Sequence, residues 1–334
     1  MSKPLLTFLS LAFAAIALAA CGGDDESDAL VVYSGRNEEL VGDLLEQYQQ
    51  DTGAKIEVRY GDSSDLAATL LEEGGNTPAD VFLSQDAGAL GAVENEGLLA
   101  PLPRSILEQV EPRFRSEEGR WVGLTGRSRV IAYDKRELKP SELPQSVFDV
   151  PGEKWEGRVG WAPTNPSFQS FVTAMRELAG EERTRRWLEA MVADDTKVYP
   201  NNISIRDAIA NGEIDIGLIN HYYVAEAVAE EGEDYPVGVF FPPNDLGSLI
   251  NVSGAAILEP SEKDAQARKF IDYMLSRQGQ RYYADVTKEY PLAAGVRPDP
   301  ALEPFDRIQA PEIDLADLDG LQETVKLLQE TGAL

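Results

Sequence analysis

The sequence feature with the clearest chemical potential is the adjacent pair Tyr222 and Tyr223. The pair follows the apolar run 214–219, which is typical of a buried strand, and opens an acidic stretch with helical spacing. Neighbours inside a helix point about 100° apart, so two adjacent phenols converge on one point only in the less regular first turn. The pair is therefore either a binding element at the edge of a cleft or amphipathic packing, which is common for tyrosine.

Enzyme motifs with fixed spacing are missing from the sequence. It contains no P-loop, no GxGxxG after a strand, no HExxH and no GxSxG. His221 is the only histidine and Cys21 the only cysteine, which excludes an internal disulfide and histidine-rich zinc, nickel or copper sites. A single histidine is more often structural than catalytic. The residues therefore favour binding over catalysis, and we do not expect an enzyme.

The elements that position these residues alternate between apolar runs and amphipathic stretches. The predicted strands are 29–33, 55–60, 80–84, 129–133, 158–161, 214–219, 237–241 and 250–258. The predicted helices are 38–51, 63–71, 88–97, 168–178, 182–191, 222–230, 262–274 and a terminal helix around 326–328. This rhythm predicts an α/β protein with parallel sheets. Such folds bind ligands beyond the carboxyl ends of their strands, here at the loops 34–37, 84–86, 125–128, 164–167 and 220–223.

The first 28 residues read as an export and anchoring segment. Lys3 precedes an uncharged stretch, 5–20, and the string Leu18-Ala19-Ala20-Cys21 resembles a bacterial lipobox. We expect a signal peptide over 1–20, then a lipidated Cys21 and a Gly/Asp-rich tether over 21–28. The alternative is an ordinary secretory signal that contains a cysteine. Either reading places the protein in the periplasm or elsewhere outside the cytoplasm, and the first makes it a membrane-anchored lipoprotein.

Length and charge bound the remaining possibilities. About 300 residues follow the tether, which is long for one hydrophobic core and natural for two lobes. The net charge is −28, so we expect no nucleic acid partner, because such a chain repels phosphates. The acidic residues are spread along the sequence, which favours solubility over a specific role for the bulk charge.

Several segments resemble the ferric-iron-binding proteins of bacterial ABC importers, also called bacterial transferrins. The most specific are NTPADVF at 76–82 and INHYY at 219–223; GLTGRSRVIAYDKREL at 123–138, VSGAAIL at 252–258 and EYPLAAGV at 289–296 also match. The similarity extends over 29–334, in the family order. It implies a type II periplasmic binding protein fold, in which two α/β lobes with a ligand cleft are joined by crossing hinge strands near Arg127 and Ile250.

The resemblance also implies the domain division, the cargo and the partners. Lobe 1 is expected to contain 29–127 plus 251–301, and lobe 2 is expected to contain 128–250 plus 302–334. Two consecutive tyrosines of the family bind Fe³⁺, and they match Tyr222 and Tyr223. Ferric iron is a hard cation that prefers anionic oxygen ligands, and a phenol is deprotonated when such a cation binds. The implied partners are the ABC permease and its ATPase in the inner membrane, with the binding protein itself a monomer.

The sequence departs from the common family pattern at three positions. Members often carry His where Asn37 stands and Glu where Gln85 stands, and some carry a third Tyr where Phe168 stands. Asp86 is a possible ligand only if the register slips by one residue. With two protein ligands left, the resemblance implies that exogenous oxygen ligands fill the remaining coordination positions.

A synergistic anion is therefore expected beside the iron, either carbonate, phosphate or a similar anion. Arg127 matches the family's carbonate-contacting arginine, and its planar fork suits a bidentate anion; the alternative for Arg127 is a surface or interlobe salt bridge. Asn165 and Ser167 lie where a loop enters a helix, which favours anions. The other candidates for anion binding or support of the site are Asn202, Asn220, Asn37 and Gln85. Pro166 removes one backbone donor from this loop.

Two alternatives to iron capture are open at this stage. The same fold binds organic solutes such as a phosphonate, thiamine or a polyamine, and the replacements at Asn37 and Gln85 make this cargo more credible. An extracellular enzyme is the other alternative, and the missing motifs argue against it.

Overall fold

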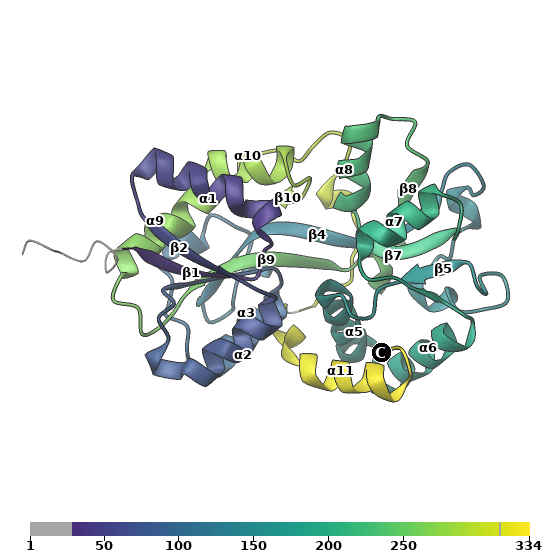
Figure 1. Ribbon diagram of the computed structural model, residues 1–334, viewed down its shortest axis with the longest axis horizontal. Helices are drawn as coiled ribbons and strands as arrows, with labels where there is room; N and C mark the ends of the chain where they lie inside the picture. Colours follow the sequence, from purple (N-terminus) through teal and green to yellow (C-terminus); the bar gives the residue numbers. More distant parts are fainter. Residues whose placement is uncertain (1–28, 314) are drawn as a thin grey trace, which may run out of the picture.

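The computed structural model describes residues 29–313 and 315–334. Figure 1 shows two lobes arranged end to end, with strands β4 and β9 running between them. The predicted signal peptide, Cys21 and the tether lie outside the described residues. Among the described residues, no helix has both the length and the apolar character needed to cross a membrane.

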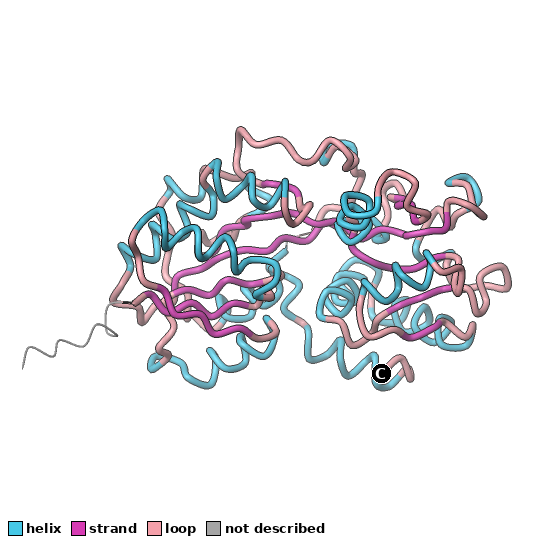
Figure 2. Tube along the Cα trace, turned by 45° about the horizontal axis from the view of Figure 1, so that its top comes forward, coloured by secondary structure: helices cyan, strands magenta, loops and turns pink. Residues whose placement is uncertain are grey.

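The strands form one mixed sheet with the order β2-β1-β3-β9-β4-β7-β5-β6, and both β10 and β8 pair with β4. They are β1 (Leu30–Ser34), β2 (Ile56–Tyr60), β3 (Val81–Ser84), β4 (Trp121–Asp134), β5 (Val159–Trp161), β6 (Lys197–Val198), β7 (Ile216–Asn220), β8 (Val237–Phe240), β9 (Ile250–Ile257) and β10 (Tyr290–Pro291). Figure 2 shows helices flanking the strands in both lobes.

The helices occupy most of the predicted positions. They are α1 (Glu38–Thr52), α2 (Ser63–Glu73), α3 (Ala87–Asn95), α4 (Arg104–Leu107), α5 (Pro166–Ala179), α6 (Glu181–Ala193), α7 (Asn202–Ala210), α8 (Tyr222–Glu231), α9 (Asp264–Leu275), α10 (Arg277–Asp285) and α11 (Leu321–Glu330). Gly53 ends α1 with φ 70°, because glycine adopts this left-handed conformation without strain. Asp62 precedes the first turn of α2, and Ser63 Oγ accepts the Gln85 N–H at 2.9 Å.

Strand β4 changes partners halfway along its length. Its first half pairs antiparallel with β9 as far as Ser128, opposite Ile250, and its second half pairs antiparallel with β7 from Arg129, opposite Asn220. The β1, β2 and β3 pairings are parallel, as predicted. The expectation of purely parallel sheets is wrong, because the two strands shared between the lobes run against their neighbours. The lobe boundaries proposed from the sequence stay a prediction.

The C-terminal segment contacts helices in both halves of the molecule. The short helix η8 (Leu315–Asp319) packs against α3, and α11 packs against α5. The approach at α3 is so close that a β-carbon on Gly88 would lie 2.2 Å from the carbonyl oxygen of Leu318. This segment is therefore a further connection across the molecule, in addition to β4 and β9.

Candidate ligand-binding cleft

The two adjacent tyrosines converge, as the sequence predicts for the first turn of a helix. Helix α8 begins at Tyr222 directly after β7, and the ring centroids of Tyr222 and Tyr223 lie 4.2 Å apart with an interplanar angle of 36°. Burial raises the pKa of both phenols, and the pKa of Tyr222 is raised well above its ordinary value, with Tyr223 and Glu289 adding to the effect. Both phenols are therefore protonated at neutral pH until a cation displaces the proton.

The pair lines a small cleft of about 90 Å³ that both ends of the sheet contribute to. Its lining residues are Gly35, Asn37, Leu40, Asp62, Ser63, Gln85, Asn165, Pro166, Ser167, Tyr222 and Tyr223. The loops after β1, β3, β5 and β7 thus meet at one place, as expected for the carboxyl ends of strands. Of the candidate residues, Asn37, Gln85, Asn165 and Ser167 share this cleft with the tyrosines.

Arg127 is on β4, in contact with the cleft residue Gln85, and is 2% exposed. One guanidinium nitrogen donates to the Gln85 carbonyl oxygen, and Nη2 has no partner among the described residues. No carboxylate among the described side chains lies within 4.0 Å of this guanidinium. Burial acts to raise the pKa of both Asp86 and Glu289, and the charge of Arg127 acts to lower it. The free Nη2 keeps one arm of the fork available for an anion.

Asn165, Ser167 and Asn220 form one hydrogen-bonded group at the start of α5. The Asn165 side chain accepts from the Ser167 N–H at 3.1 Å and from Ser167 Oγ at 2.6 Å, and Asn220 Nδ2 donates to Ser167 Oγ at 3.3 Å. Asn202 is buried at the start of α7, and its Nδ2 has no partner in the described part of the chain. Gln85 Oε1 is buried and also lacks a partner there. The unpartnered Nδ2 of Asn202 is a donor that suits a ligand oxygen, whereas Gln85 Oε1 is an acceptor that suits a donor or a cation.

The side chains of Asp86 and His221 both make hydrogen bonds to backbone groups that support the fold. Asp86 caps α3 by accepting the Ala89 N–H at 3.1 Å, which leaves it poorly placed as a replacement ligand. His221 Nδ1 accepts the Ser128 N–H at 3.2 Å, so Nε2 carries the proton and donates to the Lys288 carbonyl oxygen at 3.2 Å. Burial lowers the pKa of His221 to about 4. The predicted structural role of the histidine is confirmed, since both nitrogens of its neutral ring are hydrogen-bonded to the backbone. These bonds hold the start of α8, where Tyr222 follows, in place.

Two buried features beside the cleft were not found from the sequence. Arg36 and Glu289 form an ion pair at 2.6 Å, and each residue is 1% exposed. Arg129 is buried on β4 two residues after Arg127. The spacing of the two arginines was an available signal, because residues i and i+2 of a strand share a face. The Arg36–Glu289 pair had no such signal.

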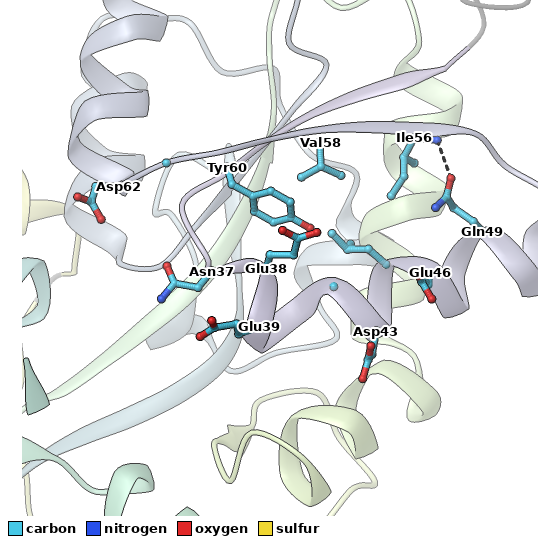
Figure 3. Close-up of a pocket in the computed structure, with 13 residues that line it drawn as sticks. Asn37, Glu38, Glu39, Asp43, Glu46, Gln49, Ile56, Val58, Tyr60 and Asp62 are labelled. Atoms are coloured by element: carbon cyan, nitrogen blue, oxygen red, sulfur yellow. Dashed lines mark hydrogen bonds between the residues drawn. The ribbon is translucent and has the colours of Figure 1, made fainter. Parts of the chain in front are cut away.

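A larger groove of about 960 Å³ adjoins the cleft between α1 and β2. Figure 3 shows Glu38, Glu39, Asp43 and Glu46 along this groove, and Asn37 and Asp62 line both the groove and the cleft. Acidic walls raise the local concentration of cations. Within the described residues, no group of three or more His, Cys, Asp or Glu side chains is arranged to hold a metal ion. The acidic side chains of the groove therefore favour the approach of cations toward the cleft.

Comparison with known proteins gives consistent matches over nearly the whole chain. Residues 76–313 match the family described as bacterial extracellular solute-binding protein. The chain is 35% identical over 333 residues to an Fe(3+)-binding periplasmic protein of Serratia marcescens, covering 99% of this chain and 96% of that protein. It is 33% identical over 327 residues to a major ferric iron-binding protein of Neisseria meningitidis, covering 97% and 98%.

Solved structures give the same result. The iron-bound HitA from Pseudomonas aeruginosa has a TM-score of 0.85 and 34% identity, covering 91% of this chain and 99% of that one. A Trichodesmium protein solved in complex with iron and citrate ligands has a TM-score of 0.78 and 29% identity, with the same coverage. The predicted two-lobed periplasmic binding architecture is confirmed by these matches.

Proposed function

Because the chain belongs to the bacterial extracellular solute-binding proteins, with the type II periplasmic binding fold, we propose that it captures ferric iron for an ABC importer. It delivers the cargo to the membrane permease, which the associated ATPase drives. Its relatives are transport proteins and not enzymes. The relatives that share about a third of the sequence are named for ferric iron, so an organic cargo is not favoured.

The observation that carries this function is the convergence of Tyr222 and Tyr223, with ring centroids 4.2 Å apart, in the cleft. Two phenolates supply hard anionic oxygen ligands, which suit Fe³⁺ far better than the soft or neutral ligands of other sites. Their burial keeps them protonated in the iron-free protein, so binding exchanges protons for metal and both protons leave to solvent.

A synergistic anion completes the iron shell. Asn37 and Gln85 add only neutral polar groups to the cleft, so two phenolates leave one positive charge of Fe³⁺ uncompensated and most coordination positions open. Arg127 Nη2 and Asn202 Nδ2 are buried donors without partners in the described chain, and they are available to carbonate, phosphate or a similar anion. The side chains of Asn165, Ser167 and Asn220 are hydrogen-bonded to one another at the start of α5, and these bonds fix their orientation.

The lobe division, the oligomeric state and the membrane anchor are proposed as the sequence predicts them. Lobe 1 contains 29–127 and 251–301, lobe 2 contains 128–250 and 302–334, and the iron is enclosed between them. Cys21 carries the lipid that holds the protein, a monomer, at the membrane surface outside the cytoplasm.

A visible spectrum tests the proposed function directly. Iron-free protein mixed with ferric citrate is expected to gain a phenolate-to-iron charge-transfer band, which the protein and ferric citrate alone do not show. A spectrum that equals the sum of the two components would exclude the proposed iron site.

A further inference from the structure

Arg129 is a buried cation without an acidic partner. It is 5% exposed and stands where β4 leaves β9 and begins to pair with β7. Among the side chains that the structure describes, no carboxylate lies within 4.0 Å of its guanidinium. Proteins rarely bury a charge unpaired, because its desolvation is costly unless another charge compensates it. Arg36, equally buried, has Glu289 as its partner.

The contacts of Arg129 lead to the cleft. Nη2 donates to the Leu218 carbonyl oxygen at 2.8 Å, which fixes the guanidinium against β7. Nη1 donates to Ser167 Oγ at 3.3 Å and to Asn220 Oδ1 at 3.3 Å. One guanidinium thus holds two of the residues that face the proposed anion.

The surroundings of Arg129 supply only partial compensation. Its guanidinium carbon lies 5.6 Å from the ring centroid of Phe168 and 5.3 Å from that of Phe171, within cation–π range. Burial lowers the pKa of Arg129 to about 9, while Tyr222 opposes this change. The side chain therefore stays charged at neutral pH, and the two aromatic faces offset only part of the cost of burying it.

We propose that Arg129 is a positioning residue for the loaded site: it orients Ser167 and Asn220 toward the anion, and its buried charge is compensated when the anion binds. This inference rests on the proposed function. It predicts that Arg129 acts in opposite directions on two quantities. Its buried charge lowers the stability of the iron-free protein, and the same charge raises the affinity of the site for iron.

The test compares R129M, R129K and the control R176M. Arg176 is also largely buried in lobe 2, but it pairs with Glu181 at 2.7 Å and donates to Gly320 and Thr324, away from the cleft. Each variant is measured for the Tm of the iron-free protein, for iron affinity in competition with citrate, and for the phosphate concentration that half-saturates the charge-transfer band.

R129M is expected to keep or raise the Tm of the iron-free protein, because removing an uncompensated buried charge is not costly. Its iron affinity is expected to fall about tenfold or more, with the phosphate midpoint raised by a similar factor. R129K keeps the charge but lacks the planar fork, so it restores part of the affinity. R176M is expected to lower the Tm and leave iron affinity and the phosphate midpoint unchanged.

Two results would overturn the proposal. One is an R129M protein with wild-type iron affinity and phosphate midpoint. The other is an R129M protein that fails to fold or loses as much Tm as R176M, because Arg129 would then be a structural cation. In both cases the proposed function stands if wild-type protein binds iron and Y222F does not. Absence of iron binding by the wild type rejects the proposed function itself.

Discussion

Arg36 Nη2 lies 2.6 Å from Glu289 Oε2, in a fully buried ion pair that joins residues 253 positions apart in the chain. Thr287 Oγ1 also donates to Glu289 at 2.9 Å, and Arg36 Nη1 approaches Thr125 Oγ1 at 3.4 Å. The pair thus connects the loop after β1, whose Gly35 and Asn37 line the cleft, with the segment between α10 and β10. It supplies no net charge to the site.

Glu289→Gln is expected to destabilise the iron-free protein by about 3 kcal/mol, because it leaves the Arg36 guanidinium buried without its counter-charge. Burial opposes ionisation of Glu289, but Arg36 outweighs it and holds the pKa of Glu289 below its ordinary value. A depressed folded-state pKa gives stability that is present above the unfolded value of about 4.3 and is lost as pH falls through the folded-state pKa.

Urea unfolding at pH 7 and between pH 5 and 3 checks both statements. The wild type is expected to lose more stability than Glu289→Gln below about pH 4. Glu111→Gln is the matched control, since its pair with Arg113 is exposed and worth little. Equal stability of wild type and Glu289→Gln at pH 7 contradicts this account of the pair.

Tyr222→Phe and Tyr223→Phe are each expected to weaken iron binding by at least about a hundredfold, since loss of a ligand exceeds the tenfold to hundredfold effect of losing an outer partner. Each change removes one phenolate and keeps the ring, so folding is preserved. Competition with citrate and the visible band measure the effect. Tyr273→Phe removes a phenol that bonds Asp51 far from the cleft and serves as the control. Unchanged colour and affinity in both cleft variants would show that the tyrosines are packing residues.

Iron binding at constant anion is expected to release about two protons from the phenols, because burial raises the pKa of both tyrosines in the iron-free protein. Affinity therefore rises with pH across the neutral range. Calorimetry of ferric citrate binding in buffers of different ionisation enthalpy gives the proton count. Tyr223→Phe is expected to release one proton fewer at saturating iron, and an unchanged count contradicts phenolate ligation.

Cys21→Ser is expected to move the protein from the membrane fraction to the soluble extracytoplasmic fraction without changing its iron affinity. The lipobox and the polar tether at 22–28 motivate this prediction. Ser27 lies within the tether, so Ser27→Ala gives a neutral control close to the anchor. A Cys21→Ser protein that stays on the membrane shows that the cysteine is not its anchor.

Local patterns revealed the tyrosine site better than they revealed its supports. INHYY combines the end of an apolar run with the start of a helix, and both follow from short-range periodicity. Helix α10 was missed because its sequence is polar. Its Gln280 is fully buried and bonds Leu124, Met274 and Ala293, which hydrophobic periodicity does not detect.

Pairings between distant segments were beyond the sequence for a physical reason. The antiparallel direction of β9 and the Arg36–Glu289 pair depend on which segments meet after the chain crosses between lobes. No residue near either segment encodes that choice locally. Arg129 differs, because strand spacing predicts that it shares a face with Arg127. The sequence does not predict that no carboxylate faces Arg129 in the described structure, since this depends on tertiary packing.

The anion requirement gives the last prediction, which concerns Arg127. Its Nη1 is engaged by the Gln85 carbonyl oxygen and its Nη2 is unpartnered among the described residues, so one arm positions the side chain and the other is available to an anion. Arg127→Ala is expected to lower iron affinity about tenfold and to weaken its dependence on carbonate or phosphate. Wild-type affinity is expected to fall when carbonate, phosphate and citrate are all removed.

The control for Arg127 is Arg113→Ala, because Arg113 is half exposed and pairs with an exposed carboxylate. Arg136 is a poorer control, since its removal would strip the buried Asp134 of its partner and lower stability. Iron affinity is titrated with and without added anion for the wild type, Arg127→Ala and Arg113→Ala. The measurement compares how strongly the affinity of each protein depends on the anion. Wild-type affinity that does not change in anion-free buffer would mean that protein groups alone complete the iron shell, and Arg127 would then have no anion to hold.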